Sequence, residues 1–494
     1  MIRFRHHLWV YACVLAVAFS CSAFAQEVAA TPEPPAPDGA AMMKAVRLHA
    51  YGGREVLQFE DAPRPRPKED EILIRVLAAG VNPVDAKIRQ GMFARMMGTK
   101  LPLIPGLDVS GLVEEAGAKV TRFKKGDPVY ACLSALRQGA YAEFAVAKVP
   151  ELDKSIAVLP LLTRSEDEAN ALLASGIRDE VTSALAKIKA LKLAPDPGSM
   201  ATDNAGDATE EAASRPDVAY VVEGDIRQDP GDRVCVSLKL MDVRNNRPLW
   251  SESFDRTAVD LPALAKEVAA EAVAVIRTTV AELEAPESEA SAKPKGLSFE
   301  GAAVMPVAAA TAWQALVELA NLSPGQTVLI HGGSGGVGVF AIQIAKARGA
   351  KVIATASAAN QEFMRDLGAD RVIDYNATRF EEVVKEVDVV LDSVAGETLK
   401  RSYGVVKKGG IIVSLLEPPD KAELDARGIR GTAFMVSPSA ALLSELTKLV
   451  EAKKLKPVIS KTFPLADVAK AHEAIETGHT RGKIVLRVAD EPKD

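Results

Sequence analysis

A glycine-rich turn between an apolar run and a helical segment is the feature that most constrains this chain of 494 residues. Residues 327–338 read TVLIHGGSGGVG, so a G-x-G-x-x-G pattern directly follows the apolar run. In such a unit the first glycine permits a tight turn, the second lets the backbone approach a pyrophosphate, and the third lets the helix pack on the strand. The sequence therefore predicts a dinucleotide-binding turn, with Gly333, Gly335 and Gly338 in these three roles.

Alternating strands and helices continue on the carboxyl side of the turn. Short apolar runs at 351–355, 371–373, 387–391 and 410–414 are separated by helical or loop segments. Strands that alternate with helices form right-handed βαβ units and a parallel, doubly wound sheet. We therefore predict an α/β Rossmann domain over residues 293–494.

The end of the second predicted strand indicates which dinucleotide is bound. NAD-binding proteins usually carry Asp or Glu there, where it holds the ribose 2′-hydroxyl. Residues 354–360 read ATASAAN and contain no carboxylate that would repel a 2′-phosphate, while Ser357 and Asn360 offer hydrogen bonds to it. The alternative for Ser357 is that it only caps the helix that follows. The sequence favours NADPH.

The amino terminus has the composition of an export signal. Arg3 and Arg5 precede an apolar, uncharged run over residues 8–19, and Ala-Phe-Ala at 23–25 fits a cleavage site. We predict a signal peptide over residues 1–25 and a periplasmic or otherwise exported protein, or a cytoplasmic one if the start codon is misassigned.

The remaining chain divides into three predicted segments. Residues 26–42 are rich in Ala and Pro and predict a disordered linker. Residues 43–150 alternate apolar and polar residues between closely spaced glycines, which predicts a small β domain. Residues 151–292 fit neither flanking block; they predict a small α+β domain inserted between the two halves of another structure.

Composition excludes some classes of protein. The net charge of −6 argues against a nucleic-acid partner, because nucleic-acid-binding domains usually carry a basic surplus. Cys132 and Cys235 are the only cysteines after the predicted signal, and one distant pair predicts no disulfide framework.

Both flanking blocks resemble the zinc-free quinone oxidoreductase branch of the medium-chain dehydrogenase/reductase superfamily. The resemblance covers about 310 residues and therefore is specific. Besides the glycine turn it rests on residues 79–85 (AGVNPVD), 105–111 (PGLDVSG), 139–143 (GAYAE), 295–299 (KGLSF), 311–314 (TAWQ), 367–370 (LGAD) and 482–486 (GKIVL).

This resemblance implies a GroES-like substrate domain over residues 43–150, to which the C-terminal end of the Rossmann domain returns, and an active site between the two domains. It implies hydride transfer from NADPH to a quinone or an α,β-unsaturated carbonyl compound. It also implies a homodimer through the edge of the Rossmann sheet, which the insert would block or preserve. The cofactor-binding residues that it adds to the glycines are Thr311, Ser334, Gly336, Val337, Tyr375, Val394, Ser414 and Leu415.

Asn82 is our catalytic candidate, because its position corresponds to a metal ligand in zinc-dependent relatives. An amide there would stabilise the negative charge that develops on a carbonyl oxygen. The alternative is that Asn82 and Asp85 only fix a local turn. Zinc relatives carry Cys at this position and Gly-His-Glu where this chain has Gly106-Leu107-Asp108, so no metal is expected.

The predicted insert resembles the small α/β domain of TolB-N-terminal type, found in cell-envelope proteins. That resemblance implies a role in interaction or sensing rather than catalysis, and hence an envelope protein partner. Two hypotheses follow: an NADPH-dependent enzyme, or a non-catalytic envelope protein that uses the reductase fold for binding. The glycine turn favours the enzyme, whereas the export signal favours the second hypothesis, because free NADPH is not expected outside the cytoplasm.

Overall fold

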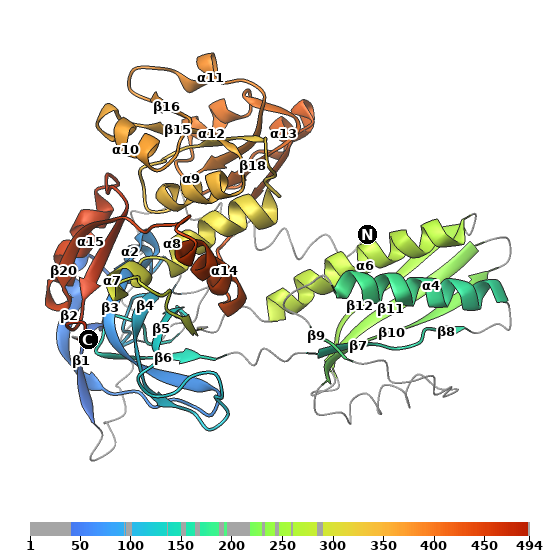
Figure 1. Cartoon of the computed structure of the whole chain (residues 1–494), viewed down its shortest axis with the longest axis horizontal. Helices are drawn as coiled ribbons and strands as arrows, with labels where there is room; N and C mark the ends of the chain where they lie inside the picture. The colour runs from blue at the N-terminus through green and yellow to red at the C-terminus, as the bar shows by residue number, and fades with distance from the viewer. Residues whose placement is uncertain are drawn as a thin grey trace.

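The structure is a computed structural model. It describes residues 41–92, 94, 101–135, 137–149, 155–163, 168–186, 192–194, 218–229, 233–242, 247–257, 260–283 and 290–492. The predicted signal peptide and nearly all of the predicted linker lie outside these residues. Within them, a Rossmann-type sheet, a GroES-like sheet and the sheet of the predicted insert occupy separate regions of the molecule (Figure 1).

The Rossmann-type sheet has six parallel strands in the order β16-β15-β14-β17-β18-β19. Numbered from β14, this is the order 3-2-1-4-5-6 that characterises dinucleotide-binding sheets. The strands are β14 (Thr327–Ile330), β15 (Lys351–Ala356), β16 (Arg371–Asp374), β17 (Val387–Asp392), β18 (Val406–Ser414) and β19 (Arg430–Ala433). The helices between them are α9 (Gly338–Ala347), α10 (Gln361–Asp366), α11 (Phe380–Val383), α12 (Glu397–Ser402) and α13 (Lys421–Arg427).

Strand β14 shows why this sheet must be covered on both faces. Its Val328, Leu329 and Ile330 are all fully buried. Successive side chains of a strand point to opposite faces. Accordingly, Val328 and Ile330 join one apolar core, and Leu329 joins a second core on the other face. A continuous apolar run is thus typical of a central parallel strand with helices on both sides.

The GroES-like sheet combines segments from both halves of the chain. Its seven strands have the order β13-β5-β4-β3-β21-β20, with β6 also pairing with β3. They are β3 (Glu71–Val81), β4 (Asp108–Ala116), β5 (Pro128–Cys132), β6 (Phe144–Lys148), β13 (Ala290–Ala292), β20 (Ile459–Pro464) and β21 (Lys483–Arg487). A smaller antiparallel pair, β1 (Met42–Leu48) and β2 (Leu57–Pro63), accompanies this sheet. Strand β13 lies at the end of the predicted insert, which extends to residue 292. It nevertheless pairs with β5 and so belongs to the GroES-like sheet.

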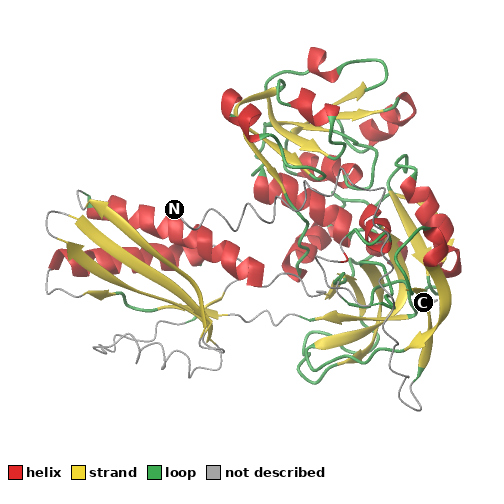
Figure 2. Ribbon diagram, turned by 180° about the vertical axis from the view of Figure 1, so that it is seen from behind, coloured by secondary structure: helices red, strands yellow, loops and turns green. Residues whose placement is uncertain are grey.

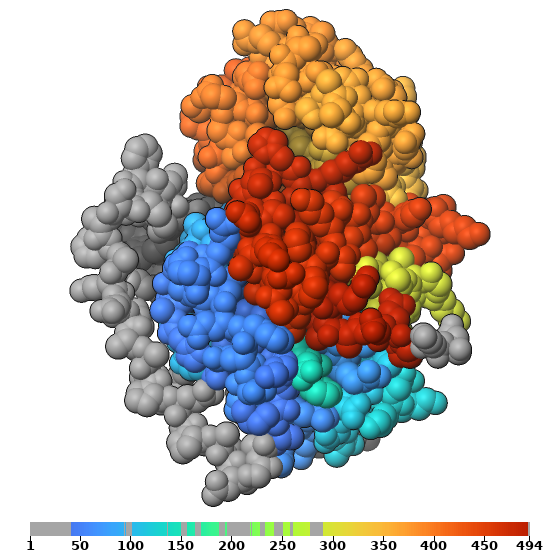
Figure 3. Space-filling model, turned by 90° about the vertical axis from the view of Figure 1, so that its left-hand side faces the viewer, coloured from blue at the N-terminus to red at the C-terminus, as the bar shows by residue number. Residues whose placement is uncertain are grey.

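The C-terminal segment lies against the N-terminal one (Figure 3). Strand β21 pairs antiparallel with β3, with Ile484 opposite Val81. Helix α15 (Val468–Glu476) packs beside α2 (Pro83–Arg89). The helices that connect the two sheets are α7 (Phe299–Ala303), α8 (Pro306–Trp313), which continues as a π-helical turn to Leu319, and α14 (Ala440–Glu451).

The region of the predicted insert has its own sheet and its own core. Its strands are β7 (Ser155–Val158), β8 (Leu162–Thr163), β9 (Lys192–Leu193), β10 (Val218–Asp229), β11 (Arg233–Asp242) and β12 (Arg247–Thr257). Helices α4 (Glu168–Leu185) and α6 (Leu261–Leu283) lie side by side on one face (Figure 2). Among the described residues, no helix is long and apolar enough to cross a membrane.

Because this core shares no residue with the other two, we expect it to unfold as a separate unit. Phe254 is buried opposite Val236, in the core that this sheet shares with α6, so Phe254→Ala should destabilise this unit by about 3–5 kcal/mol. Differential scanning calorimetry of the full chain should show one transition moving to lower temperature while the other stays in place. A single transition that shifts as a whole would contradict independent folding.

Candidate functional site

The glycine turn follows β14 and ends where α9 begins at Gly338. A Cβ atom on Gly338 would lie 2.3 Å from the carbonyl oxygen of Gly332, and one on Gly333 would lie 2.6 Å from the sulfur of Met364. These two positions therefore require glycine for the fold itself. A Cβ on Gly335 would meet only the Gly332 oxygen, at 3.3 Å, so Gly335 leaves its outer side open to a ligand.

The carboxyl edge of the parallel sheet gathers most of the residues predicted to bind the cofactor. The turn follows β14, Ser357 follows β15, and Tyr375 follows β16. Val394 follows β17, while Ser414 ends β18 and Leu415 comes after it. In open α/β sheets, ligands bind at this edge, at the point where the strand order reverses. Here that point lies between β14 and β17, beside the turn.

The predicted adenosine side of this edge is formed by β15 and β16. Ala356 and Asp374 are paired at the strand ends, and the Tyr375 amide donates to the Ala356 carbonyl at 3.2 Å, so Ser357 and Tyr375 lie next to each other. The Tyr375 side chain is 54% exposed and free to contact a ligand. Ser357 makes no capping bond; its hydroxyl accepts from Asn360 Nδ2 at 3.2 Å.

Sequence reasoning missed Arg481 on this side. Its guanidinium lies 3.8 Å from the centre of the Phe363 ring on α10, the helix that follows Ser357. Arg365, the nearest cation after residue 360 in the sequence, donates to the side chain of Gln361. No local pattern connects Arg481 with α10, because the two segments meet only in the fold.

The predicted nicotinamide side involves residues of β17, β18 and α8. Val394 is 49% exposed, and its amide donates to the carboxylate of Asp392 at 3.1 Å. The Leu415 amide donates to the Asp392 carbonyl at 2.9 Å, which keeps the two strand ends together. Thr311 lies on α8 rather than on the sheet edge, and its hydroxyl donates to the Val307 carbonyl at 2.7 Å.

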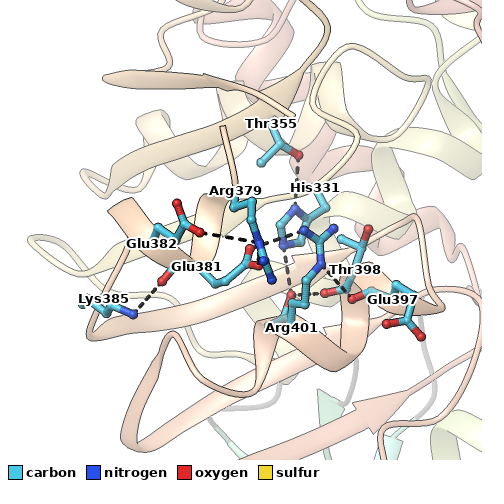
Figure 4. Close-up of polar contacts among 10 residues, drawn as sticks. His331, Thr355, Arg379, Glu381, Glu382, Lys385, Glu397, Thr398 and Arg401 are labelled. Atoms are coloured by element: carbon cyan, nitrogen blue, oxygen red, sulfur yellow. Dashed lines mark hydrogen bonds and ion pairs between the residues drawn. The ribbon is translucent and has the colours of Figure 1, made fainter. Parts of the chain in front are cut away.

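A buried histidine fixes the base of the turn (Figure 4). His331 Nδ1 lies 3.1 Å from the Thr355 hydroxyl, and Nε2 lies 3.0 Å from the Ser402 hydroxyl. Ser402 donates its own proton to the Thr398 carbonyl, so it must accept from Nε2–H, and Nδ1 accepts from Thr355. Burial, with a smaller contribution from Arg401, lowers the pKa of His331 to about 3, so the ring is neutral. The ring joins β14 to β15 and α12 without adding charge.

Asn82 begins helix α2 and is buried in a polar cluster. Its backbone N–H donates to Asp85 at 2.8 Å, which makes it a helix cap, as the local-turn alternative predicts. Its side-chain Nδ2 donates to Asp108 at 2.9 Å, and its Oδ1 accepts from Lys483. Only one of the two Nδ2 hydrogens of Asn82 is used by these bonds, so the second Nδ2 hydrogen remains for a ligand.

The two carboxyl groups of this cluster are fully buried. Burial raises the pKa of Asp85 to about 7, although the Asn82 amide and the Tyr141 hydroxyl, which donates at 3.1 Å, oppose the shift. Burial also raises the pKa of Asp108, which accepts from the Val307 amide at 2.8 Å, and lowers the pKa of Lys483. The cluster therefore contains one carboxyl group that can hold a proton near neutral pH.

The described part of the chain holds no group of three His, Cys, Asp or Glu side chains that could bind a metal ion. Cys132, the cysteine of the GroES-like sheet, is buried near both carboxylates, and burial raises the pKa of its thiol well above the usual range. Zinc sites need several thiolate or imidazole ligands together. The residues around Asn82 do not fit such a site.

Comparison with known proteins agrees with this architecture. Residues 68–154 match the alcohol dehydrogenase GroES-like domain, and residues 367–486 match the zinc-binding dehydrogenase domain. These two segments of the chain are therefore similar to the two domains found in the medium-chain dehydrogenase/reductase superfamily. The predicted fold class, a GroES-like domain with a Rossmann-type parallel sheet, is confirmed.

Relatives that match almost the whole chain are oxidoreductases. The NAD(P)H oxidoreductase RTN4IP1, mitochondrial, of Danio rerio is 28% identical over 92% of this chain and 93% of its own length. The NADPH-dependent alkenal/one oxidoreductase, chloroplastic, of Arabidopsis thaliana is 29% identical over 90% of this chain and 79% of its own. The solved quinone oxidoreductase of Coxiella burnetii has a TM-score of 0.59 at 25% identity, and covers 91% of this chain and 100% of its own.

The prediction of a periplasmic or exported protein is wrong, because these relatives are mitochondrial or chloroplastic enzymes. A basic start and a short apolar run are features of composition alone, and they do not specify a compartment. The hypothesis of a non-catalytic envelope protein depended on export and loses its main support. The homodimer, the envelope partner of the insert and the individual site residues stay predictions.

Two glycine variants should separate the fold of the turn from its ligand contact. Gly338→Ala forces the Cβ against the Gly332 carbonyl, so we expect a loss of about 1–3 kcal/mol in the free energy of unfolding. Gly335→Ala should unfold within about 2 °C of the wild type yet bind NADPH at least about tenfold more weakly, because the methyl group would occupy the ligand's approach. Thermal unfolding measures the stability of each variant, and fluorescence titration measures its affinity for NADPH. Unchanged NADPH affinity in Gly335→Ala would contradict this placement.

The buried Asp85 predicts a specific dependence of stability on pH. Its pKa is about 7 in the folded chain against 3.8 in the unfolded one, so the folded state binds more protons, and stability falls as pH rises through this window. Asp85→Asn cannot ionise. Its stability relative to the wild type should therefore increase between pH 4 and 7, by up to about 4 kcal/mol, and level off above that. Unfolding curves across this range, with Asp366→Asn at an exposed position as the control, test it; a constant difference refutes it.

Proposed function

We propose that this chain is an NADPH-dependent oxidoreductase that reduces a quinone or an α,β-unsaturated carbonyl compound without zinc. The observation that carries the proposal is the glycine turn at the switch point of a 3-2-1-4-5-6 sheet, with the open side of Gly335 at the carboxyl edge. The oxidoreductase names of the relatives support a nicotinamide cofactor and this class of acceptor.

The residues at the sheet edge fit a dinucleotide. The backbone from Ser334 to Val337 and the amino end of α9 would hold the pyrophosphate, because free N–H groups and the helix dipole favour negative charge there. Tyr375 would lie along the adenosine, and Val394 beside the nicotinamide. Bound NADPH would supply the hydride, and the chain would supply orientation and electrostatics.

The choice of NADPH over NADH rests on residues around the end of β15. Residues 354–360 contain no carboxylate, and the Ser357 hydroxyl and Asn360 amide offer hydrogen bonds. The guanidinium of Arg481, held on Phe363, adds an exposed positive charge on the same side. A 2′-phosphate would be attracted there, since charge-assisted hydrogen bonds are roughly twice as strong as neutral ones.

Asn82 would act on the acceptor. As the hydride reaches the substrate, negative charge grows on the carbonyl oxygen of the substrate. This charge needs a preorganised hydrogen-bond donor. The second Nδ2 hydrogen of Asn82 is such a donor, fixed by bonds to Asp108 and Lys483. No metal ligand set surrounds it among the described residues, so we assign the charge stabilisation to the amide.

Purified full-length protein should consume NADPH with 1,4-benzoquinone or with a short alkenal, as followed by absorbance at 340 nm. The rate should be unchanged after dialysis against EDTA, because no zinc takes part. Absence of NADPH binding at high micromolar concentration would overturn the proposed function, and loss of activity with EDTA that zinc restores would overturn zinc independence.

A carboxylate at the end of β15 should reverse the choice of cofactor. Ser357→Asp places a negative charge where the 2′-phosphate is expected, so the KM for NADPH should rise at least about tenfold. The KM for NADH should stay the same or fall, and Ser357→Ala controls for loss of the hydroxyl alone. Initial rates with each cofactor give the ratio of the KM for NADPH to the KM for NADH. An equal effect on NADPH and NADH would mean that Ser357 does not face the 2′-phosphate.

A further inference from the structure

Lys483, the first residue of β21, is a buried charged residue that takes no direct part in the proposed reaction. It is 2% exposed. Burying an ammonium group is costly unless it is paired and hydrogen-bonded, and its pKa is lowered by the burial. The partners of this group therefore indicate what it does.

All of the polar contacts of the ammonium group lie on the substrate side. Lys483 Nζ donates to Asn82 Oδ1 and to the Val81 carbonyl, the latter at 3.2 Å. Asp108 Oδ2 is 3.8 Å away and supplies the opposite charge. The positive charge is thus directed at the carbonyl oxygen of the amide that we assign to catalysis.

The stem of Lys483 and the residue before it contact the cofactor turn. The Gly482 amide donates to the Ser334 carbonyl at 2.8 Å. A Cβ on Gly336 would lie 3.1 Å from Lys483 Cδ, so the stem passes directly beside the turn. Two consecutive residues of the C-terminal segment therefore connect the predicted pyrophosphate turn to Asn82.

This arrangement allows only one orientation of the Asn82 amide. The cation contacts Oδ1, and the carboxylate of Asp108 accepts from Nδ2. A flipped amide would place N–H groups against the ammonium group and its carbonyl oxygen against the carboxylate. The second Nδ2 hydrogen therefore has a fixed direction. The positive charge of the Lys483 ammonium group beside Oδ1 polarises the amide and makes Nδ2 a stronger donor.

We propose that Lys483 is a positioning residue for hydride transfer: it fixes and polarises the Asn82 amide and couples that amide to the cofactor turn. The inference rests on the proposed function, because it assigns Lys483 a role through Asn82. It also specifies the acceptor, a substrate whose reacting group ends in an oxygen that becomes negative as the hydride arrives.

A double-mutant cycle tests the catalytic part. Lys483→Met keeps the stem but removes the charge, and should lower kcat about 10²-fold, as removal of one oxyanion donor does. Asn82→Ala should have a similar effect, and the double variant should lose little more than Asn82→Ala alone, because both changes act through one amide. Losses that multiply would overturn the proposal. Lys293→Met, at a half-buried lysine without contact to Asn82, is the control and should retain wild-type kcat.

Lys483→Gln guards against a folding defect in Lys483→Met. Its amide can still donate to Asn82 without a positive charge, so a kcat between those of the wild type and Lys483→Met supports polarisation by the charge. If Lys483→Gln is as slow as Lys483→Met but melts at the wild-type temperature, this supports the view that the charge of Lys483, and not its hydrogen bond, accounts for its whole effect on kcat. Wild-type kcat in either variant overturns the role of Lys483.

Hydrogen exchange gives a readout without turnover. NADPH binding should slow amide exchange in residues 84–89, the part of helix α2 after Pro83, by at least about threefold in the wild type, and should not do so in Lys483→Met. Binding without this protection in the wild type overturns the coupling and leaves the proposed function intact. Absence of binding overturns the proposed function, and the coupling with it.

Discussion

The antiparallel pairing of β21 with β3 is the interaction on which the rest of the candidate site depends. It brings the last strand of the chain into the sheet formed by the first domain, and in doing so places Gly482 beside Ser334 and Lys483 beside Asn82. The other connections between the two sheets run through α7, α8 and α14. The strand is apolar and fully buried from Ile484 to Leu486, so its position is held by burial as well as by the ladder of hydrogen bonds.

Electrostatics then determines how such a site can exist in the interior. Two buried carboxyl groups face one buried ammonium group, and a neutral amide lies between the charges. Since the carboxyl group of Asp85 can hold a proton near neutral pH, the cluster need not carry a net charge. His331 follows the same principle on the cofactor side, where a neutral ring with both nitrogens bonded replaces a charged group. Buried polar groups are tolerated in both places because nearly every donor finds an acceptor.

The sequence predicted what local periodicity specifies. The strand, turn and helix around Gly333 and the central parallel strands were visible as apolar runs, whereas β19 was not, because Arg430–Ala433 contains no apolar run. The widening of α8 after Trp313 into a π-helical turn that ends at Leu319 likewise has no signal in the local pattern. Lys483 and Arg481 could not be assigned from the sequence, because their partners lie in distant segments and no periodicity links them. The compartment was predicted wrongly, because a basic start followed by a short apolar run does not by itself specify a compartment.

The division of the GroES-like sheet between the two ends of the chain has a consequence for biosynthesis. A chain that leaves the ribosome from its amino terminus presents β3 to β6 early, but β21 follows only with residues 483–487. The region of α4 and α6 has all its strands within one continuous stretch and can complete its core during synthesis. The sheet that is begun first is therefore completed last. Until then the side of β3 that receives β21 is an unpaired edge, the kind of surface that chaperones bind and that aggregates when it is left exposed.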